Sequence, residues 1–117
     1  MSTEIDFLGE FLVRNFRNTA IDCIQGLCRG QFDSPGHREY QRRISTFSDE
    51  QKEVLQQVVR YCVEGALNDT LYRLDQELNK KKPRIWIEVD GEPLMRTGAP
   101  SALHSRLWGP TGWLNRY

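Results

Sequence analysis

The side chains best suited to nucleophilic or metal chemistry in this sequence are its three cysteines and two histidines. Neither His37 nor His104 has a cysteine, histidine or carboxylate at a metal-ligand spacing within one expected helix or strand. A zinc site would have to be assembled from distant cysteines, so we expect none. A dyad of Cys62 with a histidine would supply a thiol nucleophile. However, Cys62 follows the apolar periodicity of a helix, which predicts packing as a small hydrophobic side chain.

Other catalytic signatures are absent from the sequence. It contains no phosphate-binding Gly-rich loop, no Gly-x-Ser-x-Gly elbow and no His-Glu-x-x-His motif. Asp69 and Asp75 are six residues apart and face different sides of an ideal helix, so they do not form an acid/base pair. We therefore predict a protein that is not an enzyme and that uses no cofactor or metal.

The distribution of charge and of aromatic residues favours protein binding. Residues 48–79 carry seven acids against three bases, which is either the solvated face of a helix or a docking surface for a basic partner. The tail, residues 103–117, is rich in tryptophan and arginine, which dominate interface hot spots but also cover the cores of small domains. The predicted partner contacts are Glu53, Glu64, Asp69, Asp75, Arg106 and Arg116.

Two basic segments offer an alternative function. HREYQRR (37–43) and KKKPR (80–84) carry side chains that contact phosphates, and Tyr40 can stack on a base. This pattern is that of a small regulatory nucleic-acid-binding module. Lysines at a helix C-terminus are also expected from the helix dipole, and the chain has no net charge, so we favour nucleic acid less than a protein partner.

Composition limits the architecture and the compartment. With 117 residues the chain is expected to form one domain, with a helical part over 1–82 and a hairpin and tail over 83–117. It has no apolar run of about twenty residues, and acids at positions 4, 6 and 10 interrupt the segment where a signal peptide would be apolar. We therefore expect a cytoplasmic protein with no membrane partner and with buried, reduced cysteines. A homo-oligomer is left open.

Apolar side chains recur every four residues over 4–28 and predict a helix, with a kink or break near 15–18 and a stop at Gly30. The expected buried stripe is Leu8, Leu12, Phe16, Ala20 and Ile24. Ser34 followed by Pro35 predicts a short polar helix over 35–45.

A second long helix begins where Ser48 and Gln51 fit a capping box, and it ends before Pro83. About thirty residues at roughly 1.5 Å each give a length of about 45 Å, so we expect a bend at Gly65 or at 68–69, or a projecting end. Its expected buried stripe is Leu55, Val59, Cys62, Ala66, Leu74 and Leu78, with Val54, Val58, Leu67 and Leu71 beside it.

The period then changes from 3.6 to 2 in RIWIEVDGEPLMR (84–96), which predicts a β-hairpin around an Asp90–Gly91 type I′ turn. The expected pairs are Val89 with Glu92, Glu88 with Pro93, Ile87 with Leu94 and Trp86 with Met95. A short helix from Ser101 to about 107 and a turn at 109–112 should follow.

The ending LHSRLWGPTGWLNRY resembles that of small bacterial proteins which end in Leu-His-Gly-Glu-Leu-Phe-Gly-x-x-Gly-Trp-(aliphatic)-x-Arg-aromatic. The matching positions are Leu103, His104, Leu107, Trp108, Gly109, Gly112, Trp113, Leu114, Arg116 and Tyr117. Ser105 and Arg106 depart from the small–acidic pair, and Arg106 reverses a charge. Such proteins are immunity partners of secreted or contact-delivered toxins, so the resemblance implies a toxin inhibitor.

Together these features predict a mainly α (α+β) fold. Two long antiparallel helices and a short helix should carry a C-terminal β-hairpin and an aromatic tail. In that tail, Leu103, Leu107, Trp108 and Trp113 should pack on the helices and leave Arg106 and Arg116 to a partner. The function expected is occlusion of the active or essential surface of a cognate protein toxin.

Overall fold

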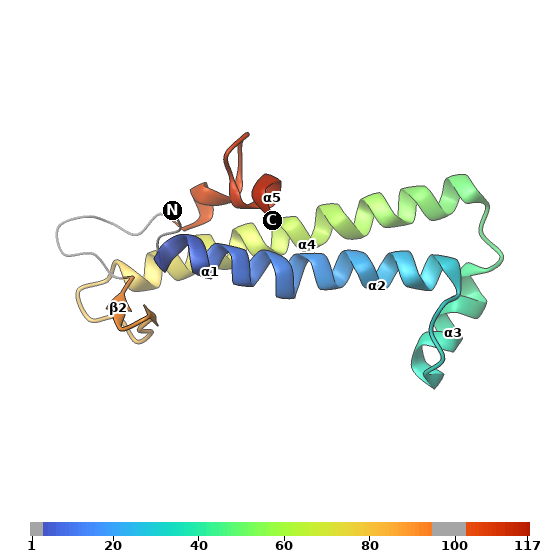
Figure 1. Cartoon of the computed structure of the whole chain (residues 1–117), viewed down its shortest axis with the longest axis horizontal. Helices are drawn as coiled ribbons and strands as arrows, with labels where there is room; N and C mark the ends of the chain where they lie inside the picture. Colours follow the sequence, from blue (N-terminus) through green and yellow to red (C-terminus); the bar gives the residue numbers. More distant parts are fainter. Residues whose placement is uncertain (1–3, 95–102) are drawn as a thin grey trace.

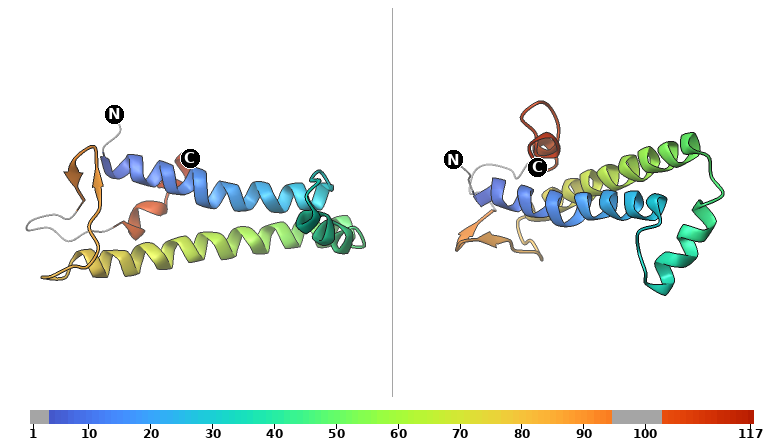
Figure 2. Two further views of the ribbon diagram at one scale, coloured as in Figure 1. Left: turned by 90° about the horizontal axis from the view of Figure 1, so that it is seen from below. Right: turned by 45° about the vertical axis from the view of Figure 1, so that its right-hand side comes forward.

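Two long helical segments run antiparallel, side by side, and form the body of the molecule (Figures 1 and 2). The computed structural model describes residues 4–94 and 103–117. In chain order the helical elements are α1 (Glu4–Leu12), the π-helical turn η1 (Val13–Arg17), α2 (Asn18–Arg29), α3 (Pro35–Ile44) and α4 (Asp49–Leu78). The strands β1 (Glu88–Val89) and β2 (Glu92–Pro93), the 3-10 turn η2 (His104–Leu107) and the short helix α5 (Trp113–Arg116) follow. The predicted fold class is confirmed.

The first helical segment contains a π turn where the sequence predicts a kink. The residues flanking η1 keep right-handed helical backbone angles, so α1, η1 and α2 form one continuous segment. A π turn holds one more residue than an α turn and therefore shifts the side chains around the helix axis. Phe16, which the periodicity places on the buried stripe, is 46% exposed, and the neighbouring Arg17 is buried. The predicted stripe is wrong at Phe16 and correct at Ile24.

The predicted helix boundaries are confirmed where a local signal defines them. Gly30 ends α2 with a left-handed φ of 67°, and Pro35 is the first residue of α3. At the start of α4, the Ser48 N–H donates to Gln51 Oε1 at 2.8 Å, and the Gln51 N–H donates to Ser48 Oγ at 3.1 Å. This is the predicted capping box.

The helix α4 continues for 30 residues through Gly65 and 68–69 without interruption. Its length makes the molecule elongated, with extents of 55 × 30 × 24 Å. The N-terminal part of α4 reaches the α3 end of the molecule (Figure 1). Within 4–94 and 103–117, no helix combines the length and apolar character needed to cross a bilayer.

The hydrophobic core lies where α1, η1, the C-terminal half of α4 and the tail meet. Its buried members are Val13, Leu67, Leu71, Leu78, Leu103, Leu107 and Trp113. Burying a leucine side chain stabilises the fold by about 1.5–3 kcal/mol, so the three tail residues contribute substantially. The prediction that the tail packs on the helices is confirmed for Leu103, Leu107 and Trp113.

Gly9 on α1 lies directly against the Trp113 side chain of the tail. A Cβ built at Gly9 would lie 2.1 Å from Trp113 Cδ2, well inside the contact distance of two carbon atoms. Trp113 is 1% exposed, and its Nε1 donates to Asp6 Oδ1 at 3.0 Å. A glycine inside an apolar helical pattern was the only sequence signal for this contact, because glycine is otherwise unfavourable there.

Gly9→Ala is expected to lower the free energy of unfolding by about 1–3 kcal/mol, because the added methyl group displaces the Trp113 indole. Gly65→Ala is the matched control, since a Cβ there would meet no atom within 4 Å. It should raise stability by about 1 kcal/mol through helix propensity. Urea unfolding measures both changes. A neutral or stabilising Gly9→Ala would contradict the close contact.

The hairpin has the predicted turn and register. Asp90 and Gly91 have φ of 53° and 78°, as a type I′ turn requires. The pairs are Glu88 with Pro93 and Val89 with Glu92, and the Leu94 N–H donates to the Ile87 carbonyl at 2.9 Å. Leu94 is buried and β1 contacts α1, so the hairpin is supported by the helices. The expected Trp86–Met95 pair and the helix start at Ser101 lie outside the described residues.

Candidate protein-binding face

One side of α4 exposes a row of apolar side chains. This row, the α4 stripe, consists of Val54, Val58, Tyr61 and Tyr72, and the half-buried Gly65 lies between the two tyrosines. Separations of four, three and eleven residues place these side chains on one side of a helix. Their exposed fractions run from 48% at Tyr72 to 80% at Tyr61, with both valines near half exposed. Apolar side chains gathered on one exposed face are typical of an interaction surface.

The burial of α4 differs from its predicted stripe. Leu67, Leu71 and Leu78 are buried, whereas Cys62 and Ala66 are exposed. Apolar residues occur on more than one side of α4, so periodicity alone could not select the side that packs. The prediction of buried thiols is also wrong, because Cys62 is exposed and the other two cysteines are half-buried.

Trp108 borders the α4 stripe and forms one wall of a groove. Its Nε1 donates to Asn68 Oδ1 at 2.8 Å. The sequence predicts that Trp108 packs on the helices; it contacts α4 through this hydrogen bond, but half of the residue stays exposed. The groove is open and has a volume of about 680 Å³. It is lined by Tyr61, Cys62, Glu64, Gly65, Ala66, Asn68, Asp69 and Trp108.

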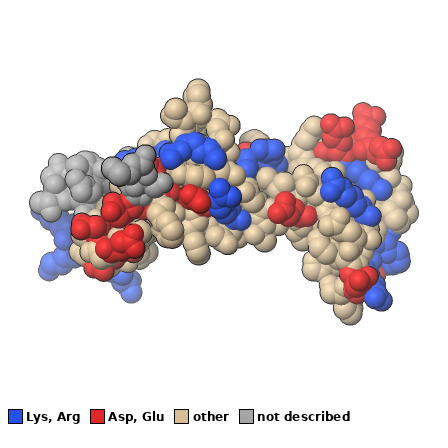
Figure 3. Space-filling view, viewed as in Figure 1, with Lys and Arg blue, Asp and Glu red and all other residues tan. Residues whose placement is uncertain are grey.

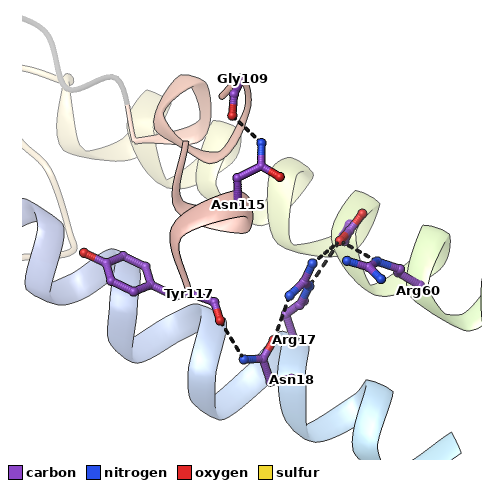
Figure 4. Close-up of polar contacts among 7 residues, drawn as sticks. Arg17, Asn18, Arg60, Gly109, Asn115 and Tyr117 are labelled. Carbon is purple, nitrogen blue, oxygen red and sulfur yellow. Dashed lines mark hydrogen bonds and ion pairs between the residues drawn. The ribbon is translucent and has the colours of Figure 1, made fainter. Parts of the chain in front are cut away.

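A part-buried ion pair joins the two helical segments next to the groove (Figure 4). Arg17 donates to Glu64 Oε2 from Nη2 at 2.9 Å and from Nε at 3.1 Å, and Arg60 Nε lies 3.3 Å from the same oxygen. Arg17 also donates to Asn18, whose Nδ2 donates to the Tyr117 carbonyl at 3.2 Å. Because a buried guanidinium needs such partners, Glu64 is a structural residue here. Glu64 also lines the groove, with 18% of its side chain exposed, so its role as a partner contact stays a prediction.

Asp75 is buried, so its predicted position on the solvent face is wrong. Its Oδ1 accepts the Leu103 N–H at 2.7 Å. Its Oδ2 accepts the His104 N–H at 3.1 Å and lies 2.7 Å from His104 Nδ1. N–H donors thus replace the water that a carboxylate would otherwise bind. Asp75 therefore anchors the start of η2 on α4.

The remaining predicted contacts lie at or near the surface. Glu53, Asp69 and Arg106 are exposed, and Asp69 lines the groove. Arg116 is paired with Asp6 at 3.3 Å while 38% of its side chain stays exposed. Arg106 forms no ion pair with any residue in the described ranges. Arg106 and Arg116 both line a second hollow of about 330 Å³, and Trp108 lines both concavities.

Acidic side chains gather at the N-terminal end of α4, at the upper right of Figure 3. Asp49, Glu50 and Glu53 are all exposed there. The first two stabilise the positive end of the helix dipole. Asp69 is a further exposed carboxylate on α4, and the exposed bases of this helix are Arg60 and Arg73.

The two basic segments considered for nucleic acid do not form one surface. Residues 37–43 lie in α3, and residues 80–84 follow α4 at the opposite end of the molecule (Figure 1). Hydrogen bonds from Arg42 and Arg43 hold the pKa of Glu39 below its ordinary value. The backbone N–H of Arg84 likewise lowers the pKa of Glu77. Glu77 also pairs with Lys80 Nζ at 2.9 Å, so part of the positive charge in both segments is paired within the chain.

The fold forms two histidine contacts that sequence spacing does not reveal. His37 Nε2 lies 4.0 Å from Cys23 Sγ, and His104 is bound to Asp75. Both contacts join different elements, so spacing within one helix could not indicate them. Among residues 4–94 and 103–117, no group of three His, Cys, Asp or Glu side chains could hold a metal ion.

The α4 stripe and the groove beside Trp108 form the candidate face, and known proteins add no identification to it. No protein-family model, curated protein or solved structure matches this chain.

Proposed function

We propose that this chain is a non-enzymatic binding protein of the cytoplasm that neutralises a bacterial toxin by covering an active or essential surface. The observation that carries the proposal is the exposed α4 stripe, together with the groove beside Trp108. A partner seated there would remove apolar area from water, at roughly 25 cal/mol per Å². Tyr61 and Trp108 are the residue types that dominate the energetics of interfaces.

The carboxylates near the α4 stripe indicate the charge that a partner of this face should carry. Carboxylates lie at the start of α4, and Asp69 lies within the groove. A partner with an apolar centre and basic surroundings is complementary to this arrangement. Such complementarity raises the association rate and selects against acidic partners.

The choice of a toxin among basic partners rests on the C-terminal resemblance to immunity proteins. Leu103, Leu107 and Trp113 match that ending and are buried, so these positions serve the packing of the tail. Arg106 departs from the ending and is exposed. We assign Arg106 a role in selecting the cognate toxin, since its charge is reversed relative to the resembling proteins.

The direct test uses the full chain and the product of the gene immediately upstream in its native host. Co-expression should restore the growth of cells that this product poisons. Isothermal titration calorimetry with the two purified proteins should show a saturable complex. A product that the chain neither binds nor neutralises would overturn the immunity function.

Within that complex, Tyr61→Ala is expected to weaken binding by about tenfold or more, because it removes an anchor from the α4 stripe. Tyr40→Ala is the matched control: Tyr40 is 59% exposed on α3, outside the stripe and the groove. It should change the dissociation constant by about twofold at most. Calorimetry on both variants measures the difference. Equal losses from both would place the interface away from the stripe.

Two other partners are distinguishable outcomes. Self-association through the stripe would give a mass that rises with concentration in sedimentation, and Tyr61→Ala would abolish it. Nucleic acid would give binding that falls steeply with salt. Either result without toxin binding would replace the proposed function.

A further inference from the structure

A second chemical grouping lies at the corner between α2 and α3, outside the α4 stripe. Cys23 Sγ, on α2, is 4.0 Å from Nε2 of His37 on α3. The other ring nitrogen, Nδ1, is hydrogen-bonded to Ser34 Oγ. Thiol, imidazole and hydroxyl thus form a connected row, the arrangement in which a base next to a nucleophile is oriented by a third group.

The imidazole of His37 is held on a second side by Phe32. Their ring centroids are 4.6 Å apart. Phe32 is fixed in turn, because its backbone N–H donates to Gln41 Oε1 at 2.8 Å and its carbonyl accepts from Gln41 Nε2 at 3.0 Å. Gly26 gives the Phe32 ring its space, since a Cβ there would lie 2.3 Å from the ring. His37 is therefore positioned by its surroundings.

This geometry suits proton transfer from the thiol. When Nδ1 donates its hydrogen to Ser34, Nε2 carries a lone pair and faces the sulfur. The thiolate, not the thiol, is the nucleophile in thiol–disulfide exchange. Cys62 is more exposed but is hydrogen-bonded to no described residue, so it provides an internal reference.

We infer that Cys23 is a site of S-thiolation by low-molecular-weight disulfides. His37 Nε2 takes the Cys23 proton, and the thiolate attacks one sulfur of the disulfide. The Cys23–sulfur bond forms as the sulfur–sulfur bond of the reagent breaks. The leaving thiolate takes the proton back from His37, so the products are one mixed disulfide and one free thiol.

The test exposes the full chain to glutathione disulfide at neutral pH and follows each cysteine by mass spectrometry. Cys23 should form its mixed disulfide about tenfold faster than Cys62, despite its lower exposure. His37→Gln should lower the rate of mixed-disulfide formation at Cys23 by about tenfold and leave the rate at Cys62 unchanged. Faster modification of Cys62 than of Cys23 would overturn the inference.

Whether His37→Gln slows or speeds the modification of Cys23 distinguishes a histidine that acts as a base from one that only packs. A histidine that only held α3 against α2 would, when replaced, expose Cys23 and speed its modification. Ser34→Ala provides a second variant at an exposed position, which removes the orienting hydroxyl and leaves the imidazole in place. It should lower the rate of Cys23 modification several-fold. An unchanged or raised rate would mean that Ser34 does not orient His37 for proton transfer.

Discussion

Trp113→Ala is expected to lower the free energy of unfolding by about 3–5 kcal/mol, a large share of the stability of a small domain. The indole is 1% exposed and lies against Gly9 on α1. Its removal leaves a cavity between α1 and the tail, and it also leaves Asp6 without the Nε1 donor. Urea unfolding followed by circular dichroism measures the loss and does not depend on tryptophan fluorescence.

Trp108→Ala is the matched control, because it removes the same side chain five residues earlier. Trp108 is half exposed, so its replacement should cost about 1 kcal/mol or less. The control also separates stability from binding, since Trp108 is a wall of the groove and its loss should weaken the toxin complex. Equal destabilisation by the two variants would mean that Trp113 is not the residue that closes the core.

Asp75→Asn is expected to lower the free energy of unfolding by about 2–4 kcal/mol, although the side chain keeps its size. In the native protein both carboxylate oxygens accept N–H groups from Leu103 and His104. An asparagine replaces one acceptor with an NH₂ donor, which then faces another donor in a buried site. Differential scanning calorimetry should show a lower melting temperature with an unchanged cooperative transition.

Asp69→Asn makes the same chemical change on the exposed side of α4 and serves as its control. Asp69 lies on the surface in the groove, so its stability change should stay within about 0.5 kcal/mol. If Asp69→Asn and Asp75→Asn cost the same, the buried carboxylate would not be the anchor of the tail.

Elements with a local signal were predictable from sequence. The Ser48–Gln51 capping box, Pro35 and the Asp90–Gly91 turn each specify one backbone geometry over a few residues. Their geometry depends little on the rest of the chain, so these boundaries and the hairpin register are confirmed.

The burial and pairing of side chains that depend on contacts between distant segments could not be predicted from local patterns. The sequence places Asp75 on the solvent face of its helix, but in the folded protein it accepts a hydrogen bond from Leu103 of the tail, 28 residues away. Arg17, in the π turn, is buried and paired with Glu64 of α4, a contact between two helical segments that the spacing within one of them does not indicate. The α4 stripe belongs to the same class, because either apolar side of α4 satisfies the helical period.

The placement of the core makes the two ends of the molecule unequal in local stability. The large buried cluster lies at the tail end. Among the described residues of α2 and α3, the buried apolar side chains are Ile24 and Ile44. Segments with few buried contacts open at a lower free energy than the whole domain. The α3 end should thus unfold locally as a separate cooperative unit. A partner that binds Val54 and Val58 would stabilise the folded form of this end, so that binding and local folding would be coupled.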